Sequence, residues 1–145
     1  MKGYKFNLQR LLDIREEQEE DSKIKFKEAR LEKEIVEQEL DRLNNDYRKF
    51  ASKTNQGTTT DKKLTWFYLE GMSRNIKKTN QELIYKDKIL EERRADLKDK
   101  KIKNKTVEIL KQKDYQRYLK IEKQQEQKEN DEFAIGGFVR KIEGR

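Results

Sequence analysis

The stretch Asn55-Gln56-Gly57-Thr58-Thr59-Thr60-Asp61 decides the fold, because it is the one polar, glycine-containing interruption between two long periodic segments. The chain of 145 residues contains no Pro, so the strongest helix breaker is absent throughout. Asn55 or Gly57 can close a helix in a left-handed conformation. Thr60 or Asp61 can then cap the next helix. The stretch therefore predicts a short turn between two helices.

The composition favours long helices over a globular core. Charged residues make up 45% of the chain and hydrophobic residues only 32%. A long helix needs only a narrow apolar seam and leaves its other positions to charge. Disorder is the competing interpretation of such a composition. Because Leu, Ile, Tyr and Phe recur here at helical spacing, we expect a chain that is nearly all helix.

The ends of the two helices also have sequence signals. Asn7 is a candidate N-cap, with Phe6 and Leu11 at the spacing of a hydrophobic staple. Gly136-Gly137 is expected to end the second helix. The sequence thus predicts one coiled-coil domain over residues 1–145. Its expected parts are a helix over about 7–54, a turn at 55–60, a helix over about 61–134 and a flexible tail at 135–145.

The apolar residues before the turn follow alternating steps of four and three. They are Leu8, Leu12, Phe26, Ala29, Val36, Leu40, Leu43, Tyr47 and Phe50, with the polar intruders Arg15, Glu19, Ser22 and Lys33. After the turn, the series is Leu69, Met72, Ile76, Thr79, Leu83, Leu90 and Leu97, followed by an expected register shift to Val107, Leu110 and Ile121. A seam this narrow is typical of a coiled coil.

A short turn makes the two helices antiparallel neighbours, so the fold class is an all-α hairpin whose second helix is longer. With the turn centred near residue 58, facing residues have numbers that sum to about 116. Phe26 then lies opposite Leu90, and the acidic segment 16–21 lies opposite the basic segment 93–103. Residues 114–134 remain as an overhang, which is either a docking surface or a solvated helix.

The residue types also limit the function. The chain has no Cys, which fits a reducing cytoplasm, and no His, which is the commonest metal ligand and general base. It contains neither a dinucleotide-binding nor a phosphate-binding glycine motif. We therefore expect a protein that is not an enzyme and has no cofactor and no metal site. No apolar run approaches the 18 residues of a membrane span.

The net charge of +7 belongs to the part of the chain after the first helix, because residues 1–54 hold 13 basic and 13 acidic side chains. A basic surface can follow phosphates, rest on anionic lipid or complement an acidic protein. The acidic protein is favoured, with no nucleic acid and no direct membrane insertion expected. The aromatic run Trp66-Phe67-Tyr68 either packs round the end of the hairpin or forms a binding tip.

Several spaced motifs resemble one known family over nearly the whole chain. They are Phe6-x-Leu8-x-x-Leu11-Leu12-x-x-Arg15-x-x-x-Glu19, Arg94-x-x-Leu97, Lys105-x-x-Glu108-x-Leu110-Lys111 and Glu126-Gln127-Lys128-Glu129-x-Asp131-Glu132. In this order they resemble the FliJ family, the coiled-coil stalk protein of the flagellar type III export apparatus. The tail Gly136-Gly137-Phe138 departs from the pattern.

The resemblance implies a non-enzymatic rod similar in shape to the γ stalk of rotary ATPases. It implies binding to and activation of the hexameric flagellar export ATPase, contacts with the membrane export gate and with export-substrate chaperones, and a cytoplasmic, peripheral position at the cell membrane. The residues implied at the ATPase ring are Leu8, Leu11, Leu12, Arg15, Glu108, Leu110, Lys111, Tyr118, Glu129, Asp131 and Glu132. Those at the export gate are Trp66, Tyr68 and Met72. A stalk of a virulence type III secretion system and a generic coiled-coil scaffold remain alternatives.

Overall fold

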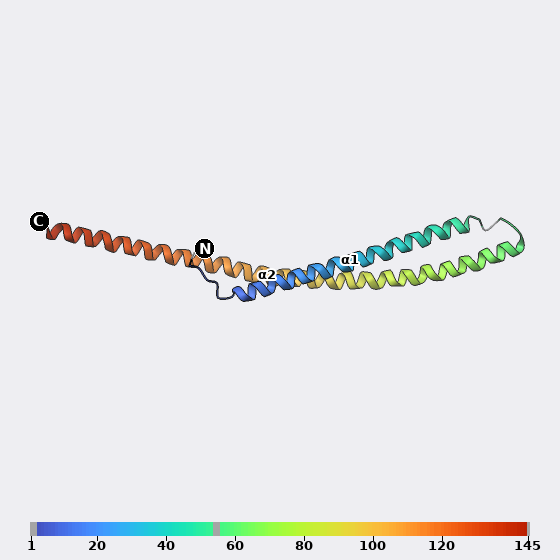
Figure 1. The fold of residues 1–145 in the computed structure, drawn as a ribbon, viewed down its shortest axis with the longest axis horizontal. Helices are drawn as coiled ribbons and strands as arrows, with labels where there is room; N and C mark the ends of the chain where they lie inside the picture. The colour runs from blue at the N-terminus through green and yellow to red at the C-terminus, as the bar shows by residue number, and fades with distance from the viewer. Residues whose placement is uncertain (1–2, 54–55, 145) are drawn as a thin grey trace. The chain divides into compact units, whose positions relative to one another are not determined.

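The computed structural model describes residues 3–53 and 56–144 and contains two helices, α1 (Gln9–Ala51) and α2 (Thr59–Glu143). They form a hairpin in which α2 has 85 residues and α1 has 43 (Figure 1). The predicted all-α hairpin with a longer second helix is thus confirmed. The contacts group the chain into two units, unit 1 (residues 1–17 and 101–145) and unit 2 (residues 18–100). Each is described by itself below, and a single domain stays a prediction.

The seam of α1 follows the predicted steps of four and three. Its buried residues are Leu12, Ser22, Ala29, Val36 and Leu43, and its half-buried residues include Arg15, Glu19, Phe26, Lys33, Leu40 and Tyr47. From Ser22 to Leu43 the buried residues recur every seven positions, which is the heptad of a coiled coil. The polar intruders therefore occupy true seam positions, and only the end residues Leu8 and Phe50 are exposed.

The seam of α2 is continuous and does not shift register. Its buried residues are Leu69, Thr79, Leu90, Asn104 and Val107, with Met72, Ile76, Leu83, Lys86, Leu97, Lys100, Lys111, Asp114 and Tyr118 half-buried between or after them. The predicted shift to Val107, Leu110 and Ile121 is wrong. Val107 and Ile121 lie on the unshifted steps of four and three, and Leu110, which lies off them, is exposed. Lysine can bury its aliphatic stem while its ammonium group stays in water. Lys100 and Lys111 therefore occupy seam positions of α2, which the spacing of apolar residues alone does not reveal.

The register of unit 2 is marked by three contacts between the helices. Ser22 Oγ donates to Asp96 Oδ2 at 2.6 Å, Lys33 Nζ lies 2.9 Å from Asp87 Oδ1, and Lys86 Nζ lies 3.1 Å from Glu32 Oε2. The residue numbers of these pairs add up to 118 or 120, where about 116 was predicted. The hydrogen bond from Ser22 is also the first cause of the lowered pKa of Asp96. The observed register is therefore shifted by a few residues from the predicted pairing of α1 with α2.

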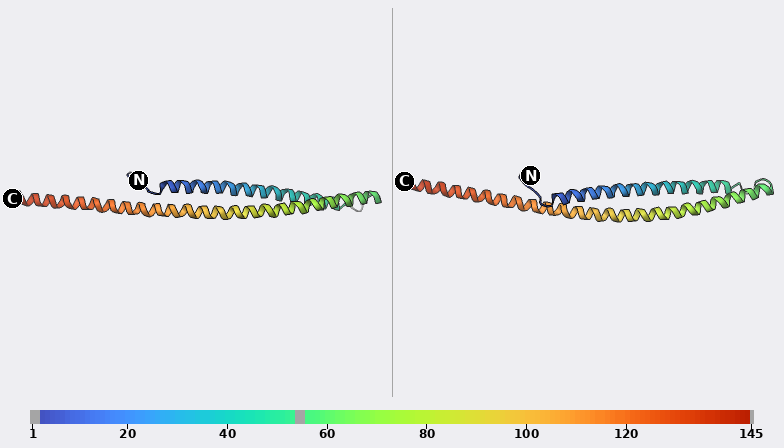
Figure 2. Two further views of the ribbon diagram at one scale, coloured as in Figure 1. Left: turned by 90° about the horizontal axis from the view of Figure 1, so that it is seen from below. Right: turned by 60° about the horizontal axis from the view of Figure 1, so that its bottom comes forward.

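This offset leaves the start of α2 without a helical neighbour in unit 2. The Phe50 and Tyr68 rings, with centroids 4.5 Å apart, form the last aromatic contact between the helices before the turn. Because α1 ends at Ala51, roughly the first two turns of α2 extend past it (Figure 2).

The turn combines a left-handed glycine with a capping box. Gly57 has a φ of 95°. Asp61 N donates to Thr58 Oγ1 at 3.2 Å, and Thr58 N donates to Asp61 Oδ2 at 3.1 Å. The cap is therefore Thr58, and not Thr60 or Asp61 as predicted. The hydrogen bond from the Thr58 backbone N–H to the Asp61 carboxylate, followed by that from the Thr58 side chain, holds the pKa of Asp61 below its usual value. Asn55, the other predicted helix-closing residue, lies outside the described residues.

Gly57→Ala is expected to lower the free energy of unfolding. A left-handed backbone costs a residue with a Cβ about 1–2 kcal/mol, and the new Cβ would lie 2.8 Å from Asp61 Oδ2. Urea unfolding followed by circular dichroism measures the change. Gly71→Ala is the matched control, because Gly71 is helical and its Cβ would meet only Arg74 at 4.0 Å. Equal unfolding midpoints for Gly57→Ala and wild type would contradict the assignment.

The C-terminal end of α2 differs from the prediction. The helix passes through Gly136-Gly137 and ends at Glu143, so the expected stop at 134 is wrong. The flexibility expected of residues 135–145 stays a prediction. Glycine costs a helix about 1 kcal/mol relative to alanine, but it keeps the backbone N–H that proline lacks. Because neither glycine has a positive φ, the backbone hydrogen bonds of α2 continue across them.

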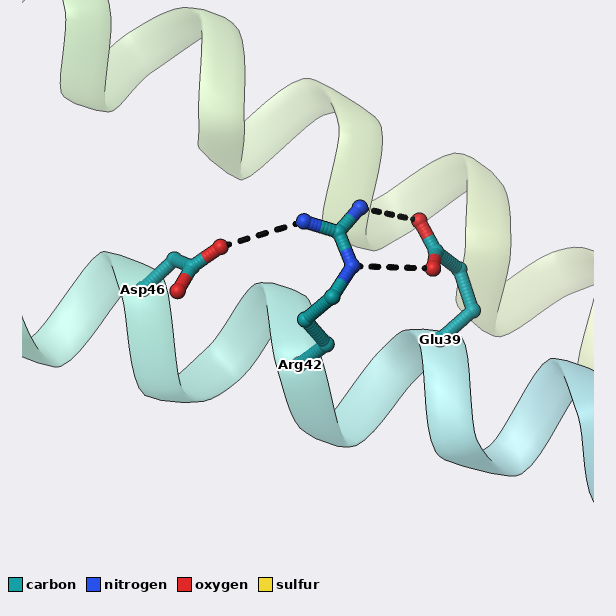
Figure 3. Close-up of polar contacts among 3 residues, drawn as sticks. All are labelled: Glu39, Arg42 and Asp46. Atoms are coloured by element: carbon teal, nitrogen blue, oxygen red, sulfur yellow. Dashed lines mark hydrogen bonds and ion pairs between the residues drawn. The ribbon is translucent and has the colours of Figure 1, made fainter.

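Much of the surface charge of α1 is paired along the helix itself. The Arg42 guanidinium donates to both Glu39 carboxylate oxygens at 2.6 and 3.0 Å and to Asp46 Oδ2 at 3.2 Å (Figure 3). This contact lowers the pKa of Glu39. Pairs three or four residues apart stabilise an exposed helix by about 0.2–0.5 kcal/mol each. They support α1 locally, while the seam holds the two helices together.

Candidate functional site

In unit 1, the segment before α1 packs against α2 as an aromatic cluster. The Tyr4 ring lies 5.1 Å from the Tyr115 ring and 5.3 Å from the Tyr118 ring, and the Tyr4 hydroxyl donates to Asp114 Oδ2 at 2.8 Å. The prediction that the overhang begins at residue 114 without a partner is therefore wrong for these tyrosines. A non-helical segment covers more length per residue than a helix, so residues 3–8 reach further along α2 than the helical pairing implied.

The start of α1 also lies later than the sequence indicated. The helix begins at Gln9, and Gln9 N donates to Phe6 O at 3.1 Å, so Asn7 lies in a turn before the helix rather than at its N-cap. Phe6 is half-buried beside α2, where it lines the same groove as Leu110. From the sequence, Tyr4 and Phe6 were either a local staple or a contact, because sequence spacing does not show contacts with a distant part of the chain.

The Tyr4 contact gives a prediction for high pH. Partial burial, followed by the hydrogen bond and the charge of Asp114, raises the pKa of Tyr4 from its usual 10.0 to about 12. Its contribution to stability is therefore complete below pH 10 and is lost as the pH rises through about 12. In a tyrosinate absorbance titration, Tyr4→Phe should remove a transition near pH 12, and Asp114→Asn should move it toward 10. If the titration curve near pH 12 is the same in both variants as in wild type, the hydrogen bond between Tyr4 and Asp114 would be contradicted.

The apolar residues implied at the ATPase ring fall into two groups in unit 1. Leu12 is buried and Leu11 half-buried, so both serve the hairpin. Leu8 and Leu110 are exposed and lie on one open groove of about 400 Å³. The groove is lined by Phe6, Asn7, Leu8, Leu110, Lys113, Asp114 and Arg117. The structure therefore brings together two of the four leucines as accessible surface.

The polar residues implied at the ring are spread along unit 1. Lys111 Nζ donates to Gln9 Oε1 at 2.6 Å, and Glu108 Oε2 lies 3.7 Å from Lys105 Nζ. Arg15 is half-buried and engaged in a contact. Tyr118 belongs to the aromatic cluster described above. The exposed acidic residues are Glu129, Asp131 and Glu132.

The three residues implied at the export gate belong to unit 2 and do not share one surface. Trp66 and Tyr68 are exposed, while Met72 is half-buried in the seam. The Trp66 ring packs edge-on against Phe67, with 5.2 Å between centroids. Leu64 and Phe67 are also exposed here. Phe67 belongs to the aromatic run noted in the sequence, whereas Leu64 was not singled out there. Their exposure follows from the register of the helices, which apolar spacing alone does not determine.

Across residues 3–53 and 56–144, His, Cys, Asp and Glu side chains form no group of three or more that could hold a metal ion. Over the same residues, no helix has the length and apolar character needed to cross a membrane.

Comparison with known proteins identifies the family. Neither curated proteins nor solved structures gave a match. The family profile described as "Flagellar FliJ protein" matches residues 4–143, which is nearly the whole chain. The match includes both helices, the aromatic cluster and the exposed overhang. The chain therefore belongs to the FliJ family of non-enzymatic stalk proteins of the flagellar export apparatus.

Proposed function

We propose that this protein is a coupling rod of the flagellar type III export apparatus that engages and activates the hexameric export ATPase. The family match over residues 4–143 is the observation that carries the proposal. Unit 1 would contact the ATPase ring, and the turn end of unit 2 would contact the export gate. Export-substrate chaperones would be further partners. The protein would work at the cytoplasmic face of the cell membrane without crossing it.

The exposed part of unit 1 supports this assignment of the ring contact. Beyond Tyr118, no helix of the described residues packs against α2, and its side chains are exposed up to Ile135. The steps of four and three nevertheless continue through Ile121 to Ile135, Val139 and Ile142. The overhang therefore presents an unpaired continuation of a coiled-coil seam beside the Leu8 and Leu110 groove, as expected of a helix that inserts into a partner.

The acidic residues of the overhang offer the sharpest test. Glu129 and Glu132 are exposed and far from the seam contacts with α1, so reversing their charge should leave the hairpin intact. With the purified cognate ATPase, wild type should raise the rate of ATP hydrolysis and promote ring assembly. The double variant E129K/E132K should lose most of this activation.

The matched control is E122K/E126K, which makes the same change of charge on exposed residues of the same helix. It should retain activation. Absence of activation by wild type at physiological salt would overturn the proposed function. Equal loss in both double variants would show that only the net charge of the overhang matters, which would contradict the residue assignment.

Arg15 and Lys111 test whether the end of the hairpin, in addition to the overhang, contacts the ATPase ring. Because Lys111 also holds Gln9, its reversal to Glu must be checked by circular dichroism before it is interpreted. A helical Arg15→Glu or Lys111→Glu variant that fails to activate the ATPase would support a ring contact at the end of the hairpin. Full activation by both variants would remove these residues from the interface.

The gate contact is a separate part of the proposal. Trp66 and Tyr68 are exposed aromatic side chains, which are frequent anchors in protein interfaces. W66A/Y68A should weaken capture by the cytoplasmic domain of the export gate without altering ATPase activation. Met72 would act by supporting these residues from the seam. Unchanged capture by the double variant would contradict this part alone.

A further inference from the structure

We propose that the turn end of unit 2 docks directly on the surface of an anionic lipid bilayer. The surface consists of an aromatic collar, defined as Leu64, Trp66, Phe67 and Tyr68, together with the basic residues on either side of the turn. The side chains of the collar are between 56% and 64% exposed. This inference does not depend on the ATPase contact, because the collar and the overhang belong to different units.

The collar is exposed because of the register of the hairpin. The contact between Phe50 and Tyr68 lies at the end of α1, and the α2 residues before Tyr68 extend past that end. No segment among the described residues covers Leu64, Trp66 or Phe67 beyond the edge contact between the last two. Large apolar side chains that remain exposed on a short segment usually mark an interaction surface.

The directions of the side chains favour a bilayer over a single protein groove. Successive helical residues point about 100° apart, so Leu64, Phe67 and Tyr68 lie on one face of α2 and Trp66 lies on the opposite face. The remaining side is that of Thr65, which is half-buried and continues the seam from Leu69. A protein groove covers one face of a helix, whereas the interfacial region of a bilayer can surround several faces of an inserted segment.

The charge around the collar is complementary to acidic lipids. Residues 48–68 contain five basic side chains, Arg48, Lys49, Lys53, Lys62 and Lys63, and one acidic side chain, Asp61. In the described part of the chain, none of the five basic side chains takes part in an ion pair, while Asp61 is used in the capping box. Trp and Tyr prefer the headgroup level of membranes, and Lys and Arg are attracted to anionic headgroups.

This contact differs from the expectation drawn from the sequence. The sequence favoured an acidic protein as the partner of the basic residues, and no direct membrane insertion was expected. The structure gathers basic and apolar side chains at one end because α2 begins beyond the end of α1. The proposed contact is peripheral, with the collar at the headgroup level.

Trp66 provides a direct readout, because it is the only Trp of the chain. The full chain would be mixed with vesicles of phosphatidylcholine and phosphatidylglycerol at a ratio of about 3:1, and with vesicles of phosphatidylcholine alone. With the anionic vesicles, the Trp66 emission should move to shorter wavelengths and the protein should sediment with the lipid. Neutral vesicles or high salt should reduce the bound fraction by about tenfold, since the attraction is electrostatic.

Two pairs of variants separate the collar from general effects of charge and hydrophobicity. L64S/F67S and K62E/K63E should each lose most of the vesicle binding while keeping the helical circular dichroism spectrum. The matched controls I84S/Y85S and K77E/K78E make the same changes on exposed residues elsewhere in unit 2 and should bind like wild type.

Three outcomes would overturn the proposal. They are the absence of wild-type binding to anionic vesicles, equal binding to neutral vesicles, and equal loss of binding in the control variants. If the gate domain alone captures the collar in solution while vesicles do not bind, the surface recognises protein and not lipid. Since no ATPase is present in this assay, its failure leaves the proposed function untouched, and failure of ATPase activation leaves this assay unaffected.

Discussion

Leu90→Ala is expected to lower the free energy of unfolding by about 2–5 kcal/mol, the range for removing a buried leucine side chain. Leu90 is 4% exposed and lies in the seam of unit 2, close to the layer where Arg94 covers the Phe26 ring at 5.6 Å. Few other large side chains are buried as deeply, so neighbouring side chains cannot easily move in to fill the cavity that the substitution leaves. Urea unfolding followed by circular dichroism at several protein concentrations measures the loss.

Ile84→Ala is the matched control for this substitution. Ile84 belongs to the same helix but is 67% exposed, so its truncation should change the free energy of unfolding by less than about 0.5 kcal/mol. Equal effects of the two substitutions would contradict the assigned seam of α2. An unfolding midpoint that rises with protein concentration would contradict a hairpin formed within one chain.

Val36→Asp is expected to have the second large effect, loss of a cooperative unfolding transition. Val36 is 8% exposed and lies between Ala29 and Leu43 in the heptad series of α1. Burying an unpaired carboxylate costs several kcal/mol, which is a large part of the total stability of about 5–15 kcal/mol typical of a folded domain. Thermal unfolding measured by circular dichroism should become broad and begin at a lower temperature.

Ile35→Asp controls for helix propensity and charge. Ile35 precedes Val36 in the sequence, is also β-branched, and is 66% exposed. The same new carboxylate there should leave a cooperative transition close to that of wild type. If both variants unfold alike, α1 is sensitive to charge in general, and the one-sided seam would be refuted.

The seam of α1 was predictable because its spacing is regular even where polar residues fill it. Ser22 and Lys33 follow the same steps of four and three as the apolar residues around them, and the structure buries or half-buries both. The left-handed Gly57 was also predictable, because few other residues adopt that backbone. Local rules were therefore sufficient for the hairpin itself.

The later seam of α2 and the register were not predictable in the same way. Asn104 and Lys111 occupy seam positions there, so the apolar residues nearby suggested a false shift to Leu110. The register depends on where Thr58 caps α2 relative to the end of α1 at Ala51, which spacing within each helix does not reveal. The aromatic run Trp66-Phe67-Tyr68 was recognised from the sequence as either packed or a binding tip, but its exposure follows from that register.

The candidate ring contact was recognised from family motifs, and those motifs do not separate exposed residues from structural ones. Leu8 and Leu12 belong to the same motif, yet one is exposed and the other is buried against α2. For Tyr4 the sequence left a local staple and a contact open, and in the structure Tyr4 joins three residues more than 100 positions away. Contacts of this range depend on the fold and not on local pattern.

Gly136-Gly137 lowers the helical stability of the C-terminal end of α2. Nothing in the described structure packs against this end, so its helical order depends on backbone hydrogen bonds and local propensity, which glycine weakens. Isolated helical ends open readily, and their amide hydrogens exchange with solvent sooner than those of the paired seam. A partner that grips Ile135, Val139 and Ile142 would therefore supply ordering as well as contacts, and part of its binding free energy would be spent as lost chain entropy.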